Sequence, residues 1–271
     1  MLDGTRLKVA LFDLDGTVYR GERLLPEIDR VIAALRDAGV QVRFLTNTAT
    51  ERRQTFANRL TEFGIPTEPA DVINSGWVTA RYLAEIHPDR TALVIGAPPL
   101  VAELEAHGIE TTTDAPGEVV VASRHPGFTY RTLTLALRSI EPDTPFVATN
   151  PDRTVPTDGG EVPGAAGMIG AIEDVTGRSV DTILGKPSRR MLDAALDGLD
   201  CETSCCVVVG DRLDTDIAMA SQAGLRSVLV LTGTTDRETL DTATIEPDVV
   251  VTSAADLLER LDPPAEVGDD R

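Results

Sequence analysis

The sequence predicts an α/β fold with mainly parallel sheets. Short apolar runs, each about as long as a buried strand, alternate with segments of helical length along most of the chain. This alternation is typical of parallel strands that are connected by helices. Several helical segments end at a glycine, which readily adopts the left-handed conformation that closes a helix. With 271 residues, the chain is long enough for one large or two modest domains.

The first part of the chain has a strand–helix–strand pattern. Residues 7–13 form an apolar run that ends in an aspartate and predict a buried strand. Pro26 opens a helix whose apolar residues recur every three or four positions, and Gly39 ends it. The elements that follow, identified in the same way, are a strand at 40–46, a helix at 51–63 and a strand at 71–74.

The same alternation continues through the middle of the chain. The loop at 150–164 is expected to lack regular structure because it is rich in proline and glycine. The regular elements predicted around it are helices at 76–86, 99–107, 129–139 and 165–176, and strands at 91–96, 117–123 and 145–150.

The last third of the chain predicts four more strands. Residues 262–271 are polar and contain two prolines, so we expect this tail to be disordered. The predicted elements before the tail are strands at 182–184, 205–210, 225–231 and 248–251, and helices at 188–198 and 214–222.

The charge balance excludes some classes of protein. The 44 acidic residues outnumber the 25 lysines and arginines, so the formal net charge is −19, and such a chain repels nucleic acid and anionic membranes. No stretch of about 18 residues is apolar throughout, so no membrane-spanning helix is expected. The N-terminal residues are charged and lack the apolar run of a secretory signal, so we expect a cytoplasmic protein.

The basic residues are almost all arginine, because Lys8 and Lys186 are the only lysines. Many acids with few lysines resemble the proteins of a halophilic archaeon, where molar salt shortens the Debye length to about 3 Å and weakens self-repulsion. An acidic protein from a GC-rich genome is the alternative. The cysteines Cys201, Cys205 and Cys206 form no CxxC pair, so we expect buried, inert thiols rather than a disulfide framework or a zinc site.

Four of the predicted strands end in residues that suit a metal and a phosphoryl group. If the sheet is parallel, these ends share one edge, where an α/β protein binds its ligands. Converging carboxylates repel one another unless a cation lies among them, and oxygen ligands suit Mg²⁺. The four strand ends are Asp13-Leu14-Asp15-Gly16-Thr17, Thr46-Asn47, Gly185-Lys186-Pro187 and Gly210-Asp211, the last followed by Asp214 and Asp216.

These segments, in this order, resemble the four motifs of the haloacid dehalogenase superfamily. The stretch FVATNPDRTVPTDGGEVPGAAGMIGAIEDVTG, followed by ILGKPS, resembles the NagD-type, 4-nitrophenylphosphatase-like branch, subfamily IIA. The resemblance covers the chain from Lys8 to about Leu261. It implies a Rossmann-like core at residues 1–77 and 184–261, interrupted by an α/β cap domain of the C2 type at residues 78–183.

The resemblance also implies roles for individual residues. Asp13 would attack phosphorus and form an aspartyl-phosphate, and Asp15 would protonate the leaving group and then activate water. Thr46 would bind the phosphoryl group with support from Asn47, and Lys186 would hold both the phosphate and the nucleophile.

The metal implied by the resemblance is Mg²⁺. Its ligands would be Asp13, the main-chain carbonyl of Asp15, and Asp211, while Asp216 would orient a bound water or Lys186 from farther out. Asp214 is equally suited to the site and to a helix cap. Asp216 could also be a plain acid at a helix start, which the helix dipole favours.

On the cap, the resemblance implies that Asn150 and Asp152 face the substrate, although both are also common turn formers. Arg124, Arg131 and Arg153 are candidates for contacts with an anionic substrate, or are surface charges. The segment 122–128 departs from the pattern of many relatives, which carry a glycine and an acid here, so cap specificity does not transfer from them.

The expected function is therefore a Mg²⁺-dependent phosphatase that acts on small phosphomonoesters such as sugar phosphates, glycerol phosphates or nucleotides. Its partner would be a small phosphorylated metabolite, without nucleic acid or membrane, and relatives suggest a possible homodimer through the cap. Two alternatives use the same core: a phosphotransferase or phosphomutase, and a non-catalytic phosphate-binding regulatory protein.

Overall fold

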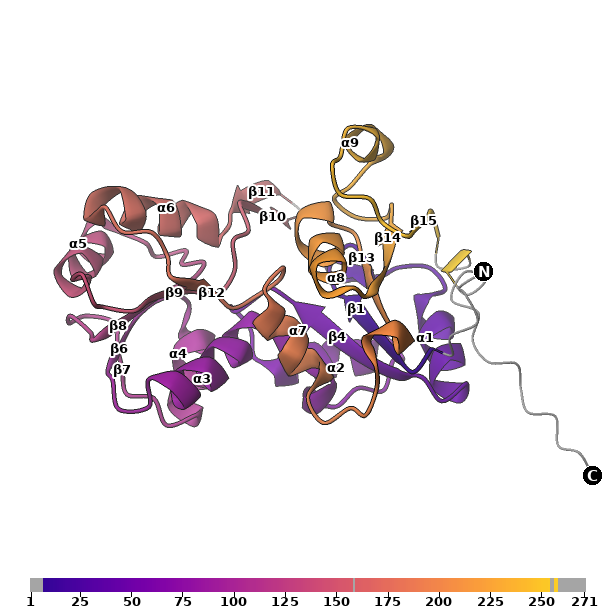
Figure 1. The fold of residues 1–271 in the computed structure, drawn as a ribbon, viewed down its shortest axis with the longest axis horizontal. Coiled ribbons are helices and arrows are strands. Elements are labelled where there is room, and N and C mark those ends of the chain that lie inside the picture. The colour runs from indigo at the N-terminus through magenta and orange to yellow at the C-terminus, as the bar shows by residue number, and fades with distance from the viewer. Residues whose placement is uncertain (1–6, 158, 254–255, 258–271) are drawn as a thin grey trace, which may run out of the picture. The chain divides into compact units, whose positions relative to one another are not determined.

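The computed structural model describes residues 7–157, 159–253 and 256–257 (Figure 1). The tail for which disorder is expected, residues 262–271, lies outside this range. Within the described residues, no helix is both long enough and apolar enough to cross a membrane. The α/β class predicted from the sequence is confirmed, because helices alternate with strands that pair in parallel.

The chain divides into two compact units. One consists of the described residues of Met1–Thr46, Ala57–Val72 and Ala195–Arg271, and the other of Asn47–Phe56 and Ile73–Ala194. The chain therefore leaves the first unit twice and returns to it twice. The core and cap boundaries at residues 78 and 183 remain a prediction.

The first unit is built on a six-stranded sheet. The pairings from β15 through β14, β13 and β1 to β4 are all parallel. Every residue of β1 and β13 is buried, as expected for central strands that are covered on both faces. The strands, in spatial order, are β15 (Val249–Val251), β14 (Arg226–Val230), β13 (Cys206–Gly210), β1 (Val9–Asp13), β4 (Gln41–Thr46) and β5 (Val72–Asn74).

The helices around this sheet agree with the sequence pattern. In α1 the apolar residues at helical spacing, Ile28, Val31, Ile32 and Leu35, are the buried ones, and α1 contacts β4. A π-helical turn at Leu213–Ile217 leads into α8, which contacts β14. These helices are α1 (Ile28–Asp37), α2 (Arg53–Glu62), which contributes residues to both units, α8 (Ala218–Ala223) and α9 (Arg237–Asp241).

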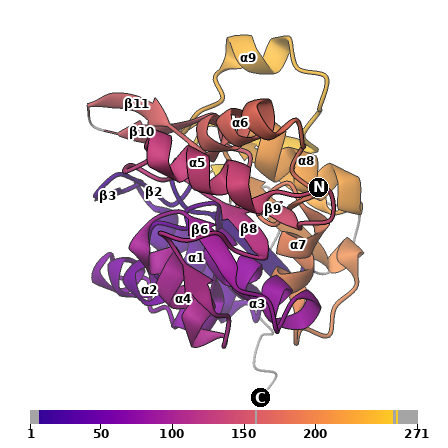
Figure 2. The same cartoon turned by 90° about the vertical axis from the view of Figure 1, so that its left-hand side faces the viewer.

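The second unit contains a five-stranded parallel sheet in the order β12-β9-β8-β6-β7. Helices α5 and α6 pack together on one face of it, and α3 and α4 lie on the other (Figures 1 and 2). The elements are α3 (Ser75–Ile86), β6 (Ala92–Ile95), α4 (Pro98–Ala106), β7 (Thr111–Thr112), β8 (Val119–Ala122), α5 (Tyr130–Ser139), β9 (Phe146–Ala148), α6 (Ala165–Thr176), β12 (Thr182–Ile183) and α7 (Arg189–Leu196).

The prediction that residues 150–164 lack regular structure is wrong. They contain an antiparallel hairpin of β10 (Thr154–Thr157) and β11 (Gly160–Pro163). Both strands of a two-stranded ribbon are edge strands, and an edge strand tolerates a proline that cannot donate a hydrogen bond. Gly160 supplies the turn with its positive φ of 106°, so the glycines and prolines build the hairpin instead of preventing it.

Some short elements were not predicted from the sequence. The hairpin of β2 (Tyr19–Arg20) and β3 (Arg23–Leu24) follows β1 directly. β7 is only two residues long and α9 only five. Elements this short carry too few residues for a hydrophobic period to be visible.

Candidate active site

The end of β1 and the end of β13 bring two aspartates together. The two strands are neighbours in register, with Phe12 opposite Val209. Asp13 is the last residue of β1, and Asp211 directly follows β13. Because the strands are parallel, both carboxylates reach the same edge of the sheet. Asp13 is 8% exposed and Asp211 1% exposed, so neither is an ordinary solvated acid.

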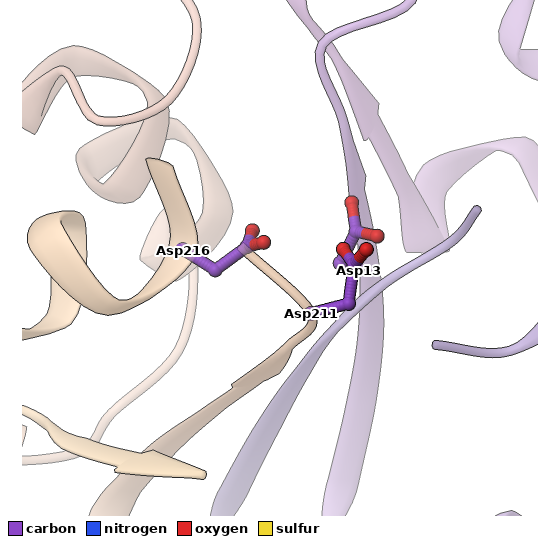
Figure 3. Close-up of side chains that lie close together, drawn as sticks. All are labelled: Asp13, Asp211 and Asp216. Atoms are coloured by element: carbon purple, nitrogen blue, oxygen red, sulfur yellow. The ribbon is translucent and has the colours of Figure 1, made fainter. Parts of the chain in front are cut away.

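A third buried carboxylate comes from the π-helical turn after β13. Asp216 is 1% exposed, and its Oδ2 accepts a hydrogen bond from the backbone N–H of Arg212 at 3.2 Å. One carboxylate oxygen from each of Asp13, Asp211 and Asp216 lies within 4.8 Å of the other two. Figure 3 shows Asp13 and Asp211 at the ends of adjacent strands, with Asp216 projecting from the helical turn.

Glycines leave the space that these carboxylates occupy. A Cβ on Gly16, whose φ is +91°, would lie 2.6 Å from Oδ2 of Asp211, and a Cβ on Gly210 would lie 2.6 Å from Oδ2 of Asp216. A Cβ on Gly233 would collide with the Asp211 carboxylate. The backbone N–H of Thr234 donates to the same oxygen of Asp211 at 2.5 Å.

The loop at 232–235 was not among the sequence-predicted site residues, yet it holds Asp211. Besides the Thr234 contact, Thr232 Oγ1 donates to the carbonyl of Gly16 at 2.7 Å, and Arg20 donates to the carbonyl of Thr232. The position of this loop in the sequence could have identified it, because the loop follows β14, which is the neighbour of β13 in the sheet.

We expect Gly233→Ala to weaken the site strongly. The added methyl group would push the Asp211 carboxylate out of its position, and we expect metal-dependent activity to fall about 10–100-fold, as for other groups that orient a metal ligand. Steady-state rates over a range of Mg²⁺ concentrations would measure this.

Gly170→Ala is the matched control for that substitution. Gly170 lies within α6, and a Cβ there meets no atom within 4 Å among the described residues. Equal rates for the two variants would show that the space at Gly233 is unimportant.

The donor set fits a hard divalent cation. Three buried carboxylates this close together repel one another at low dielectric, and a cation among them removes that repulsion. Oxygen ligands are those that Mg²⁺ prefers. Asp13 and Asp211 are positioned to ligate such an ion. Asp216 has an oxygen in the same group, close enough to contact a ligand of the ion.

Asp15 lies outside this buried group. Its side chain is more than a third exposed, but the protein packed around it still raises the pKa of its carboxyl. Burial is the main cause, opposed by the backbone N–H of Gly21 and by the charges of Arg20 and Arg59. A raised pKa suits a group that has to deliver a proton near neutral pH.

Thr46 is the last residue of β4, the other neighbour of β1. The register places Asp13 opposite Leu45, so Thr46 follows at the same sheet edge as the carboxylates. It is buried. Asp214, in contrast, has a side chain that is 70% exposed and pairs with Arg212 at 3.2 Å, outside the group formed by the three buried aspartates.

The prediction that the strand before Lys186 ends at the edge of the same sheet is wrong. That strand is β12, which belongs to the five-stranded sheet of the second unit. The sequence pattern identified a strand there but could not assign it to a sheet, because strand pairing depends on residues far away in the chain.

Within the second unit, Asn47 connects three segments. Its Oδ1 accepts the backbone N–H of Lys186 at 2.7 Å, and its Nδ2 donates to the carbonyl of Lys186 at 3.1 Å and to Oδ1 of Asp152 at 3.0 Å. Its own carbonyl accepts from Asn150 Nδ2 at 2.8 Å and from Ser75 Oγ at 2.6 Å. The sequence-predicted residues Asn47, Asn150, Asp152 and Lys186 are therefore brought together.

The cap arginines are less constrained. Arg131 and Arg153 are exposed, and Arg124 is partly exposed. Their role in substrate binding remains a prediction.

Comparison with known proteins agrees with this arrangement. Residues 10–110 match the family of haloacid dehalogenase-like hydrolases, and residues 183–257 match a second family described as HAD-hydrolase-like. The sugar-phosphatase AraL of Bacillus subtilis is 34% identical over 249 residues, which cover 91% of this chain and 90% of AraL. The glycerol-3-phosphate phosphatase of Gallus gallus is 34% identical over 285 residues, covering 93% of this chain and 91% of that protein.

The solved structures agree. The p-nitrophenyl phosphatase from Archaeoglobus fulgidus superimposes with a TM-score of 0.88 at 32% identity, covering 94% of this chain and 99% of that one. A putative NagD protein gives a TM-score of 0.86 at 29% identity, with 95% and 98% covered. The chain therefore belongs to the haloacid dehalogenase-like hydrolases, in the branch of NagD and the 4-nitrophenylphosphatases, and is an enzyme of this phosphatase family.

Proposed function

We propose that this enzyme is a Mg²⁺-dependent phosphatase that hydrolyses small phosphomonoesters through an aspartyl-phosphate on Asp13. The observation that carries the proposal is the group of three buried carboxylates, Asp13, Asp211 and Asp216, at the carboxyl edge of a parallel sheet. The relatives named for sugar phosphates and glycerol 3-phosphate support substrates of this class.

Each residue of the site has its own role in the proposed reaction. Asp13, at the end of a fully buried strand, attacks phosphorus. Asp15 gives its proton to the leaving oxygen, and as a carboxylate it then takes a proton from the water that hydrolyses the acyl phosphate. Thr46 donates a hydrogen bond to the phosphoryl oxygens. A bound Mg²⁺ would supply positive charge that stabilises the developing negative charge.

Lys186 supplies a second positive charge, and Asn47 holds its backbone. We assign to Lys186 the binding of phosphoryl oxygens, a role that suits an ammonium group. The paired bonds from Asn47 to the N–H and the carbonyl of Lys186 fix the backbone of this residue. Asn47 therefore supports phosphate binding through Lys186, and its bond to Asp152 extends this support to the loop at 150–152.

Phosphate release from a panel of phosphomonoesters tests the function. The panel would include sugar phosphates, glycerol 3-phosphate, dihydroxyacetone phosphate and nucleoside monophosphates, each with Mg²⁺ and with EDTA. We expect Mg²⁺-dependent release, fastest with a three- to six-carbon phosphate ester. If folded protein releases phosphate only when an alcohol acceptor is absent, and otherwise forms a new ester, the enzyme is a phosphotransferase. No release from any ester by folded protein would contradict the phosphatase and favour phosphotransfer or a non-catalytic role, and a new ester formed with an added acceptor would identify phosphotransfer.

We also propose that the protein is adapted to high salt, as expected for a halophilic archaeon. The net charge of −19, with only two lysines, supports this. Raising KCl from about 0.1 M to about 1 M shortens the Debye length from about 10 Å to about 3 Å and so weakens repulsion between surface carboxylates.

The salt proposal predicts a higher melting temperature in salt. We expect the thermal midpoint to rise by several degrees between those two KCl concentrations, and activity at low salt to be a minor fraction of the maximum. Circular dichroism at matched protein concentration would measure the midpoint. Full stability and full activity in dilute buffer would contradict the proposed adaptation to high salt. The phosphatase proposal would not be affected by that result.

A further inference from the structure

The three cysteines do not form the uniformly buried set expected from the sequence. Cys206, the first residue of β13, is fully buried, but Cys201 and Cys205 are partly exposed. A 3₁₀ turn at Thr203–Cys205 folds the chain back, so that Cys201 meets the start of the strand. The burial expected for all three thiols is therefore correct only for Cys206.

The fold places two of these thiols in contact. The sulfur atoms of Cys201 and Cys206 are 3.5 Å apart. Cys206 Sγ also lies 3.4 Å from the carbonyl oxygen of Glu202, to which it donates. A thiol has a single proton, so when Cys206 donates to Glu202 its sulfur lone pairs are left to face Cys201. A disulfide requires the two sulfurs at about 2.0 Å, so these sulfurs have to approach from 3.5 Å.

We propose that Cys201 and Cys206 form an intramolecular disulfide when the protein meets a low-molecular-weight disulfide such as glutathione disulfide. Cys205 does not take part, since its sulfur is directed to Ser204 Oγ at 3.9 Å. The proposal does not rest on the phosphatase activity.

The exchange has two steps that balance. The thiolate of Cys201 attacks one sulfur of glutathione disulfide, whose S–S bond breaks, and one glutathione leaves as thiolate. Cys206 then attacks Sγ of Cys201 in the mixed disulfide and gives up its proton as the S–S bond forms, and the second glutathione leaves and takes up that proton. In total, two protein thiols are oxidised to one disulfide, and one glutathione disulfide is reduced to two glutathiones.

The environment of the pair determines which thiol reacts first. Burial raises the pKa of Cys206 to about 12, assisted by its contact with Cys201 and by the nearby thiols. Cys206 therefore remains a thiol and does not start the exchange. Cys201 is the partly exposed member of the pair, so an oxidant reaches it first, and Cys206 is already in contact to resolve the mixed disulfide.

The bond would lie at the end of β13 opposite to the carboxylates. β13 begins at Cys206 and ends at Gly210, directly before Asp211. A disulfide here ties the 3₁₀ turn to the first residue of a fully buried central strand and restricts the unfolded chain. It leaves the Asp211 end of the strand in place, so we infer a stabilising modification and not a switch of the catalytic site.

Thiol counting and peptide mapping on the folded full-length protein test the proposal. After incubation with glutathione disulfide, we expect the number of titratable thiols to fall from three to one, with a mass loss of two hydrogens. Cleavage after arginine leaves all three cysteines in the peptide of residues 191–212, and cleavage after Glu202 then separates Cys201 from the other two. The fragments should stay joined until dithiothreitol is added.

Cys205→Ser is the matched variant. We expect Cys205→Ser to lose both of its remaining thiols and to keep its two peptide fragments joined. The fragments of Cys201→Ser and of Cys206→Ala should separate after cleavage. Separate fragments in the wild type, glutathione left on Cys201, or joined fragments in Cys206→Ala would each overturn the proposal. If Cys206→Ala fails to fold, the wild type and Cys205→Ser still decide.

Discussion

Asp13→Asn is expected to reduce phosphate release by roughly 10⁴-fold or more, in line with the loss of a nucleophile in other enzymes that use covalent catalysis. An amide has almost the same shape as a carboxylate, so the end of β1 keeps its geometry. It lacks the charge needed to attack phosphorus and to form the acyl phosphate. The measurement is phosphate release from the best ester of the panel, under saturating Mg²⁺.

Asp37→Asn is the control for that substitution. Asp37 is the exposed last residue of α1, in the same unit. Its substitution by asparagine removes the same negative charge, but at a solvated position. We expect wild-type rates for it. If Asp13→Asn folds normally and keeps more than about a tenth of the activity, water attacks phosphorus directly and Asp13 is not the nucleophile.

Asp211→Asn is expected to weaken Mg²⁺ binding by at least about 10–100-fold and to reduce activity correspondingly. Asp211 is buried, it is held by the N–H of Thr234, and it lies among the three carboxylates that would surround the ion. Removing its charge removes attraction for the cation. Isothermal titration calorimetry with Mg²⁺ alone measures the loss without using activity.

Stability in EDTA separates loss of the metal from loss of the fold. Without a cation, the carboxylates of Asp13, Asp211 and Asp216 repel one another, and an amide at 211 reduces this repulsion. The metal-free variant should therefore melt no lower than metal-free wild type. Asp214→Asn, at an exposed residue paired with Arg212, should bind Mg²⁺ normally. Equal Mg²⁺ affinity for Asp211→Asn and wild type would contradict the proposed metal site.

The strand ends show why much of the candidate site was predictable. Asp13 and Asp211 each end an apolar run that is buried throughout, and a parallel arrangement brings such ends to one edge wherever the strands lie side by side. Local pattern and the parallel class were sufficient to group Asp13, Thr46 and Asp211. The same reasoning included Lys186 in that sheet and was wrong, because β12 pairs with β9 in the second unit.

The order of the strands depends on contacts between residues far apart in the chain, and no local period records them. The hairpin at 154–163 shows another limit of prediction from the sequence. Its prolines and glycines argue against a central strand, but they are compatible with an isolated two-stranded ribbon. The loop at 232–235 shows a third. The backbone N–H of Thr234 holds the Asp211 carboxylate, and a backbone group leaves no signature in side-chain chemistry.

The sequence by itself determined the class of the fold, most of its helices and strands, and the candidate residues at the strand ends, because burial periodicity and charge at strand ends are local properties. The tertiary structure alone decided which strands share a sheet, and that Asp216 but not Asp214 joins Asp13 and Asp211. It also decided that Asn47 holds Lys186 and that Cys201 contacts Cys206. Each of these depends on the path of the backbone between residues, and that path is set by the packing of the whole unit.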